Sequence, residues 1–373
     1  MRVILTGGGT AGHISPAIAI SEEIMRREPK SEILFVGREG GAENDAVIRA
    51  GYPLRTVKIC GLSRRVSLEN IKNLFLALKS LSAAGRIISD FSPDAVIGTG
   101  GYVCWPMLKS AQKRGIPTVI HESNATAGLS TRLVADGCER VFLNFPECAS
   151  TLKRQENISV VGNPVRTDFS RINRTQARRR LGASADSFVI VSFGGSGGAK
   201  RLNEAILSLI EDYSTKKRGI YHLHASGRKY YDAITKEAQT LTEGTHSAKI
   251  VPYIDNMAEA LTAADLVISR SGAMTLSEIA ESGTPAILIP SPTVTDNHQY
   301  KNALVFAERG AAVIIEEADL SAQTLIHEIE KLRKNRALRL RMQSELETLK
   351  TPLASSKIYG EIREMLGKIT LRQ

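Results

Sequence analysis

Strand-like runs recur along the first half of the chain, and each is followed by glycine or polar residues and then by a segment with helical spacing. These runs are Val3–Leu5, Ile33–Val36, Arg55–Ile59, Ala95–Ile97 and Thr118–Ile120. Short, mostly apolar runs that alternate with helices are typical of a parallel sheet buried on both faces. Helices are predicted over about 16–27, 42–50, 67–89 and up to Arg114, with Pro16 in a first turn and Ser67 as an N-cap.

The same pattern restarts in the second half. Strand-like runs there are Phe188–Val191, Leu266–Ile268, Ile287–Pro290 and Val313–Ile315. We therefore predict an α/β protein with two Rossmann-like, doubly wound parallel-sheet domains that face a cleft. The expected boundaries are 1–163 for an N-terminal domain and 164–350 for a C-terminal domain. A helix in 351–373 is expected to pack back toward the N-terminal domain.

Composition and charge narrow the classes of partner. The chain has 373 residues, 42% of them hydrophobic, a net charge of +10 and no apolar run approaching the ~20 residues of a membrane span. Aromatic residues make up only 5%, so we expect no nucleic acid partner, whereas an anionic membrane face or a polyanionic substrate fits the charge. Four scattered cysteines are expected to be reduced core thiols of a cytoplasmic protein.

Two glycine-rich loops follow strands at corresponding places in the two halves. Gly7-x-Gly9-x-x-Gly12 matches a dinucleotide fingerprint, but Arg38 stands after the second strand where an NAD site needs an acid. An NADP-dependent reductase is therefore disfavoured without being excluded. The loop Gly194–Gly198 has glycines too closely spaced for that fingerprint, and both loops suit close backbone approach to a phosphate or sugar.

Two strand ends in the first half carry candidate catalytic groups. His13 directly follows the first glycine loop and is our candidate general base, with Glu122 as its orienting group or as an alternative base. The structural alternative for His13 is a residue at the start of a helix that bonds a neighbouring carbonyl. For Glu122 it is a solvated polar turn.

The stretch from Ser269 to Asn302 is the strongest candidate for a nucleotide-sugar site. Ser271 and Gly272 open a helix whose free N–H groups and positive dipole end suit a pyrophosphate. Glu278, about two turns on, is placed to accept hydrogen bonds from a ribose. The amides, imidazole and phenol between Asn297 and Asn302 suit sugar hydroxyls. The alternative interpretation is a capped surface helix followed by a polar loop.

No metal site or cofactor is predicted. The chain has no Asp-x-Asp triplet, and we interpret His222 and His224 as core or surface residues rather than ligands. A pyrophosphate leaving group would then be stabilised by backbone N–H groups, a helix dipole and cations such as Arg166. The helix that contains Phe75, with Lys72, Lys79 and Arg86, fits a membrane-surface helix or a helix packed on its own sheet.

Five motifs, in order along nearly the whole chain, resemble the MurG family of UDP-N-acetylglucosamine:lipid I N-acetylglucosaminyltransferases. The motifs are Gly7–Ala17, Gly98–Val103 with His121–Asn124, Gly194–Asn203, Ser271–Glu278 and Asp296–Ala303. The resemblance implies a GT-B fold and an inverting, metal-independent hexosyl transfer. N-acetylglucosamine (GlcNAc) would pass from UDP-GlcNAc to the C4 hydroxyl of N-acetylmuramic acid (MurNAc) in undecaprenyl-pyrophosphoryl-MurNAc-pentapeptide, giving lipid II.

The same resemblance implies that 1–163 is the acceptor and membrane-side domain and that 164–350 is the UDP-GlcNAc-binding domain. It also implies roles for individual residues. Donor contacts fall on Thr10, Ala11, Gly12, Asn124, Arg166, Ser196, Ile254, Ala273, Met274, Thr275, Leu276, Ser277, Glu278 and Gln299. Acceptor contacts fall on Gly100, Gly101 and Tyr102, with His13 and Glu122 near the acceptor. It also implies a peripheral protein at the cytoplasmic face of the cell membrane. Its roles would be peptidoglycan and cell-wall synthesis, cell shape and cell division, with other cell-wall synthesis proteins as partners.

The chain departs from the family pattern at Ala11, Trp105, Ser123 and Gly197. Ala11 and Trp105 fall in proposed acceptor loops, so two alternatives stay open beside the transferase. One is another GT-B enzyme, such as a glycolipid glycosyltransferase or a sugar-nucleotide epimerase. The other is a catalytically weak paralogue that binds UDP-GlcNAc or lipid.

Overall fold

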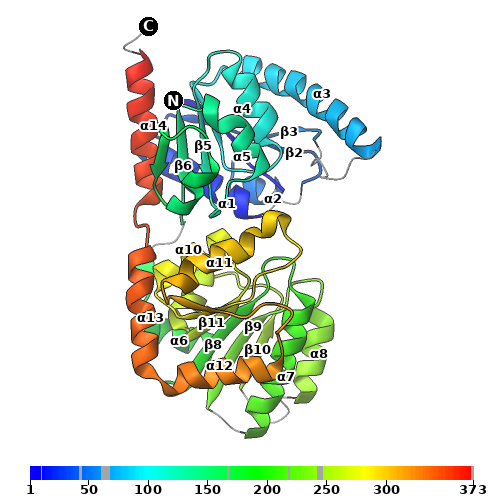
Figure 1. The fold of residues 1–373 in the computed structure, drawn as a ribbon, viewed down its shortest axis with the longest axis vertical. Helices are drawn as coiled ribbons and strands as arrows, with labels where there is room; N and C mark the ends of the chain where they lie inside the picture. Colours follow the sequence, from blue (N-terminus) through cyan, green and yellow to red (C-terminus); the bar gives the residue numbers. More distant parts are fainter. Residues whose placement is uncertain are drawn as a thin grey trace. The chain divides into compact units, whose positions relative to one another are not determined.

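The computed structural model describes residues 1–9, 11–41, 44–59, 68–165, 169–216, 219–241 and 247–370, with backbone alone for 11, 68–78 and 370. The chain divides into two compact units (Figure 1). Unit 1 comprises Met1–Arg166 and Thr351–Gln373, and unit 2 comprises Thr167–Lys350. Each unit is built on its own parallel sheet, which confirms the predicted fold class of two α/β domains.

Within its described residues, unit 1 has a seven-stranded parallel sheet in the order β3-β2-β1-β4-β5-β6-β7. The strands are β1 (Arg2–Thr6), β2 (Glu32–Arg38), β3 (Leu54–Val57), β4 (Ala95–Gly98), β5 (Thr118–Glu122), β6 (Arg140–Leu143) and β7 (Ile158–Val160). The helices are α1 (Ala11–Arg27), α2 (Asn44–Arg49), α3 (Leu68–Phe91), α4 (Cys104–Gln112), α5 (Leu129–Val134) and α14 (Ala354–Thr370), with short turns η1 (Ala135–Gly137) and η2 (Pro146–Thr151).

Unit 2, over its described residues, has a six-stranded parallel sheet in the order β10-β9-β8-β11-β12-β13. The strands are β8 (Phe188–Phe193), β9 (Ile220–Ala225), β10 (Ala248–Val251), β11 (Leu266–Ser269), β12 (Ala286–Leu288) and β13 (Ala312–Ile314). The helical elements are η3 (Phe169–Arg171), α6 (Arg174–Leu181), α7 (Lys200–Lys216), α8 (Tyr231–Leu241), α9 (Met257–Ala263), α10 (Ala273–Ser282), η4 (Thr295–Asn297), α11 (His298–Glu308), α12 (Ala322–Lys334) and α13 (Arg336–Leu349).

Both sheets reverse their strand order next to the first strand of the unit. In unit 1 the reversal lies between β1 and β4, and in unit 2 it lies between β8 and β11. Open α/β sheets bind ligands outside the carboxyl ends of the strands at such a switch point. The four loops that follow these strands are the glycine and serine loops singled out from the sequence, so the topology brings them together in pairs.

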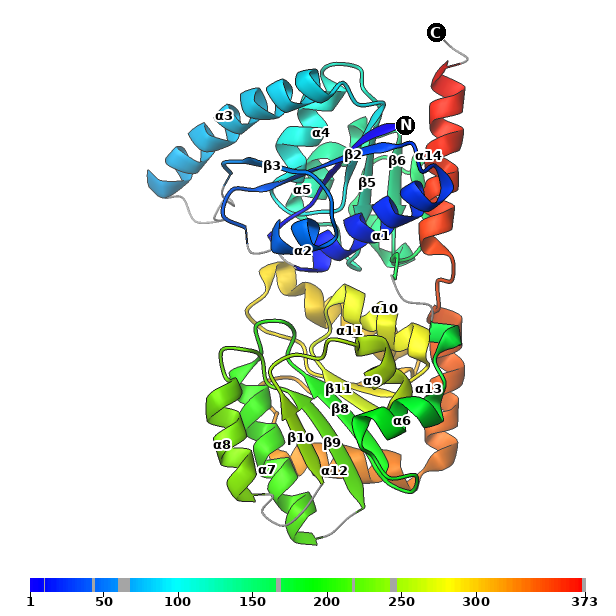
Figure 2. The same cartoon turned by 180° about the vertical axis from the view of Figure 1, so that it is seen from behind.

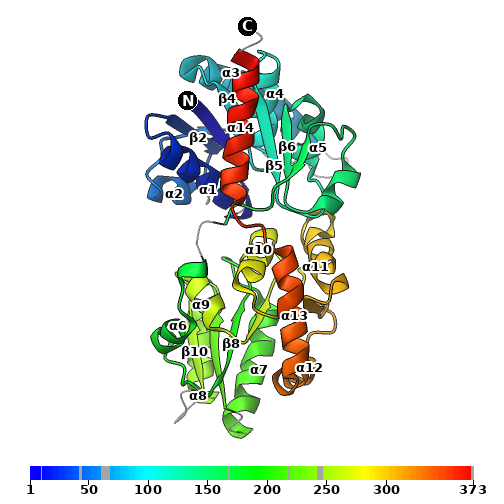
Figure 3. The same cartoon turned by 90° about the vertical axis from the view of Figure 1, so that its left-hand side faces the viewer.

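Helix α14 belongs to unit 1, although α13 before it belongs to unit 2. It runs alongside α1, as Figures 2 and 3 show from two sides. Ile358 and Ile362 are fully buried and share a core cluster with Ile18 of α1. The Ser356 hydroxyl donates to Glu23 at 2.8 Å, which adds a polar contact to the apolar one.

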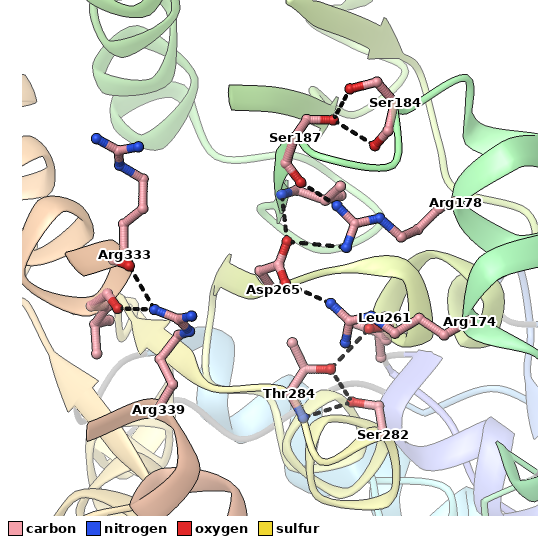
Figure 4. Close-up of polar contacts among 12 residues, drawn as sticks. Arg174, Arg178, Ser184, Ser187, Leu261, Asp265, Ser282, Thr284, Arg333 and Arg339 are labelled. Atoms are coloured by element: carbon pink, nitrogen blue, oxygen red, sulfur yellow. Dashed lines mark hydrogen bonds and ion pairs between the residues drawn. The ribbon is translucent and has the colours of Figure 1, made fainter. Parts of the chain in front are cut away.

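Asp265 fixes the opposite end of the unit 2 sheet, where strands β8 and β11 begin. Its carboxylate accepts the backbone N–H of Val189 at 2.7 Å and Nη2 of Arg174 at 2.6 Å, and Arg178 lies 3.5 Å away (Figure 4). One carboxylate therefore satisfies a strand N–H and holds two arginines of α6. This accounts for part of the basic segment 171–180 that the sequence shows.

Several local expectations need correction or fall outside the description. Helix α1 begins at Ala11, so Pro16 lies inside the helix instead of in its first turn. A proline there removes the backbone N–H that would otherwise donate to the carbonyl of Gly12. Cys104, Cys138 and Cys148 are buried free thiols, and Cys60 lies outside the described residues. Over the residues described, no helix is long and apolar enough to cross a membrane.

Candidate active site

The first glycine loop interlocks with the loop after β4. Gly8 donates its N–H to the carbonyl of Gly100 at 3.2 Å, and a Cβ at Gly101 would lie 1.9 Å from the carbonyl oxygen of Gly8. Gly100 and Gly101 both have positive φ, at +105° and +86°. Glycine is therefore required at Gly101 by both space and conformation. Tyr102, which follows, is 45% exposed and is available to a ligand.

His13 lies on the first turn of α1, with its ring against Gly100. Its Nδ1 is 2.9 Å from the carbonyl oxygen of Gly8, which can only accept. Nδ1 therefore carries the proton, and the neutral ring has its lone pair on Nε2. A Cβ on Gly100 would lie 3.0 Å from that Nε2. The bond to the Gly8 carbonyl is thus compatible with the role of base. It fixes the tautomer in which Nδ1 carries the proton, and a base needs the lone pair on Nε2.

Glu122 ends β5 as a buried carboxylate, and its donors come from the loop after β5 and from α5. It accepts four hydrogen bonds, from N and Nδ2 of Asn124, from N of Gly128 and from Oγ1 of Thr131, at 2.6–3.1 Å. A carboxylate with this many donors organises the segment around it. None of these four donors belongs to His13, and two of them belong to Asn124, so the carboxylate positions Asn124.

The second glycine loop, Gly194–Gly198, rests on the turn after β9. A Cβ at Gly198 would lie 2.2 Å from the carbonyl oxygen of Ser226, and one at Gly194 would lie 2.6 Å from the backbone nitrogen of Ala199. Ser196 lies exposed in this loop, where its hydroxyl is available to a ligand.

Helix α10 begins as the sequence predicts, with Gly272 as its N-cap and no side-chain cap. The Ser271 hydroxyl is used elsewhere, because it donates to the carbonyl of Gln299 at 2.8 Å. The first-turn N–H groups of α10 therefore keep the geometry of an anion site. Ser271 instead ties the start of α10 to the start of α11.

The side chains of 273–278 point in different directions. Leu276 is fully buried, and Ala273 and Ser277 are nearly so, with the Ser277 hydroxyl donating back to the Ala273 carbonyl. Leu276 can therefore meet a donor only through its backbone. Met274, Thr275 and Glu278 are half-buried. Burial raises the pKa of Glu278 from 4.5 to about 7.

The loop before α11 is shaped by its own polar groups. Asp296 and Asn297 have positive φ, and Oε1 of Gln299 accepts the N–H of Ser291 at 2.9 Å.

Arg270, which the sequence analysis missed, donates to the carbonyls of Ile289 and Pro290 and pairs with Glu317. Its place directly after β11 was the available signal. Ile254 is buried just after β10.

Comparison with known proteins identifies the family of the chain. Glycosyltransferase family 28 models match residues 3–143 (N-terminal domain) and 189–358 (C-terminal domain). Relatives from Acetivibrio thermocellus and Desulforamulus reducens are 39% and 40% identical over 98% and 99% of this chain and 98% and 100% of theirs. Both are named UDP-N-acetylglucosamine--N-acetylmuramyl-(pentapeptide) pyrophosphoryl-undecaprenol N-acetylglucosamine transferase. The chain belongs to the MurG family.

Solved structures agree with this family. The crystal structure of Acinetobacter baumannii MurG matches with a TM-score of 0.76 and 27% identity, covering 97% of this chain and 99% of that one. The UDP-GlcNAc 2-epimerase of Neisseria meningitidis, at 15% identity, has a TM-score of 0.69, covering 98% of this chain and 100% of that one. That second likeness shows the shared fold alone. The fold of this MurG family member is thus the predicted GT-B fold.

Three residues of the family pattern have side chains that lie outside the described part of the structure. Thr10 and Arg166 lie outside the described residues, and Ala11 is described by its backbone, as the first residue of α1. Trp105, a second departure in a proposed acceptor loop, is partly buried and packs against the core of unit 1. Its indole is therefore held at least partly by the protein interior.

The raised pKa of Glu278 predicts a pH-dependent cost of folding. A carboxyl with a raised folded-state pKa favours folding when protonated, and this contribution is lost as pH rises from 4.5 to about 7. Glu278→Gln removes this loss. We expect the difference in Tm, variant minus wild type, to be several degrees larger at pH 8 than at pH 5.

Thermal melts at the two pH values test this, with Glu308→Gln as the control. Glu308 is exposed at the end of α11, so its substitution removes a charge without removing a buried one. A Tm difference for Glu278→Gln that is the same at both pH values contradicts the interpretation.

Proposed function

We propose that this chain transfers GlcNAc from UDP-GlcNAc to the C4 hydroxyl of MurNAc in undecaprenyl-pyrophosphoryl-MurNAc-pentapeptide, giving lipid II for peptidoglycan synthesis. The observation that carries this proposal is the sequence identity of 39–40%, over nearly the full length of the chain, to relatives that bear the transferase name. Both halves of the required machinery lie within the matched residues, with the donor half in unit 2 and the acceptor half in unit 1.

Unit 2 binds the donor through backbone and one carboxylate. The N–H groups that open α10 and those of the Gly194–Gly198 loop face the diphosphate. Glu278 accepts the ribose hydroxyls, Ile254 meets the uracil through its backbone, and Gln299 contacts the sugar. These groups stabilise the UDP leaving group without a bound metal ion.

Unit 1 activates the acceptor. The lone pair on Nε2 of His13 takes the proton of the C4 hydroxyl as its oxygen bonds to C1 of GlcNAc. The bond from C1 to the diphosphate oxygen breaks on the opposite side, and UDP leaves with the electron pair, so the configuration inverts. Gly100, Gly101 and Tyr102 receive the acceptor, and Glu122 holds the loop that carries Asn124.

The acceptor is anchored in a membrane, so we place the protein at the cytoplasmic face as a peripheral protein. The net charge of +10 supports contact with anionic lipid. On α3, Lys79 and Arg86 are exposed, whereas Phe75 and Lys72 lie among the residues whose side chains are not described.

Transfer itself is tested with UDP-GlcNAc and a short-chain lipid I analogue, with and without EDTA. We expect disaccharide formation at the same rate in both, because the leaving group is stabilised by protein groups. No product, with UDP-GlcNAc binding intact, contradicts the acceptor assignment and favours another GT-B enzyme or a binding paralogue. Activity that EDTA abolishes contradicts the metal-free mechanism.

His13→Ala removes the proposed base. We expect kcat to fall by about 10²–10⁴-fold with the donor KM little changed, which is the usual size of general base catalysis. His327→Ala is the matched control, because His327 is 77% exposed on α12. Near-normal turnover of His13→Ala on saturating acceptor shows that another group is the base.

Glu278→Ala removes the proposed ribose contact. We expect the donor KM to rise by about 10–100-fold, the loss typical of hydrogen bonds to a charged group, while the acceptor KM stays within twofold. Steady-state kinetics with each substrate varied in turn measure both constants. An unchanged donor KM removes Glu278 from the ribose site.

A further inference from the structure

A chain of buried polar side chains lies between the first two strands of unit 2 and the helix that follows the Gly194–Gly198 loop. Its members are Ser192 of β8, His222 and His224 of β9, Asn203 of α7 and the carbonyl of Ser226. We call them the histidine network. Each of these residues is at most 1% exposed, so none of them can touch a substrate directly.

The hydrogen bonds of the histidine network run in a single direction. Nδ2 of Asn203 donates to the Ser226 carbonyl at 2.9 Å, which leaves Oδ1 to accept from Nε2 of His224 at 3.1 Å. The neutral His224 ring then accepts on Nδ1 from the Ser192 hydroxyl at 2.7 Å. The Ser192 oxygen in turn accepts from Nε2 of His222 at 2.7 Å.

Both rings are neutral in this arrangement, because Nδ1 of His224 accepts a hydrogen bond and no described acceptor faces Nδ1 of His222. Burial lowers the pKa of His224 to about 4 and that of His222 well below its usual value. Among the described residues, Nδ1 of His222 has no hydrogen-bond partner, which marks that ring as the start of the chain. Position 224 therefore needs a side chain that accepts a hydrogen bond at one end and donates one at the other.

The network ends on the backbone that supports the glycine loop. A Cβ on Gly198 would lie 2.2 Å from the Ser226 carbonyl oxygen, and one on Gly227 would lie 2.5 Å from Gly198. Asn203 also belongs to the first turn of α7 and donates its N–H to the carbonyl of Ala199. The position of Ser226 relative to α7 therefore sets the position of the loop between them.

We propose that His224 and Asn203 are positioning residues that hold the Gly194–Gly198 loop in the shape that receives the donor diphosphate. The proposal rests on the proposed function for the assignment of the donor. An apolar side chain at 224 removes the acceptor of the Ser192 O–H and the donor to Oδ1 of Asn203, and these two buried groups find new partners most readily if the backbone moves. That movement shifts Ser226 and the loop resting on it.

The test compares UDP with uridine, since only UDP carries the diphosphate. Binding to the full chain is measured by competition against UDP-GlcNAc for wild type, His224→Leu, Asn203→Leu and His224→Gln. We expect the two leucine variants to bind UDP about tenfold more weakly, roughly the loss of one hydrogen bond, with uridine affinity unchanged within twofold. His224→Gln, which keeps a donor and an acceptor, should restore most of the UDP affinity.

Thr284→Val controls for stability. It removes a buried hydrogen bond in unit 2, from Oγ1 to the Leu261 carbonyl at 2.8 Å (Figure 4), and leaves the loop untouched. We expect a lower Tm with an unchanged ratio of UDP to uridine affinity. Unchanged UDP binding in the leucine variants, an equal loss of UDP and uridine, or a His224→Gln variant as weak as His224→Leu overturns the proposal.

UDP binding is measured without an acceptor, so the two proposals fail separately. A wild-type chain that binds UDP but forms no disaccharide contradicts the proposed acceptor while leaving the positioning role testable. A wild-type chain that does not bind UDP contradicts both the donor assignment and the positioning role.

Discussion

A Cβ atom at Gly101 would lie 1.9 Å from the carbonyl oxygen of Gly8, and one at Gly198 would lie 2.2 Å from that of Ser226. In both units, therefore, two backbone segments touch at the carboxyl ends of the strands with no side chain between them. Any residue other than glycine would separate these segments. The hydrogen bond from Gly8 to Gly100 and the tautomer of His13 depend on the first contact, and the shape of the Gly194–Gly198 loop depends on the second.

The sequence predicts this architecture well because periodicity and glycine spacing are local signals. Strand runs such as Val3–Leu5 are continuous and apolar because both faces are buried, and the loops follow them directly. The opening of α10 at Gly272 was equally predictable, since a strand, a glycine and an apolar helical face stand in order. What sequence could not supply was how the polar side chains pair.

Glu122 illustrates the limit. As a residue type it suits a base, an orienting group or a sugar ligand, and only the folded loop shows that Thr131, nine residues on, donates to it. Ser271 is similar, because its position suggested a cap and its hydroxyl instead bonds Gln299, 28 residues away. Leu276 is a different case. Helical spacing already places it on the buried face of α10, so any contact it makes with a ligand is through its backbone.

Glu278 shows how binding and stability are linked in this fold. The cause of its raised pKa is burial, so ionising it at neutral pH costs the free protein stability. A ligand that donates two hydroxyl hydrogen bonds to this carboxylate replaces the water that burial removed. The cost of ionisation is then offset in the complex, and the ligand-bound state is stabilised relative to the unfolded chain. A carboxylate placed half inside the protein is thus better suited to a ribose than an exposed one, because its charge has little competing hydration to lose.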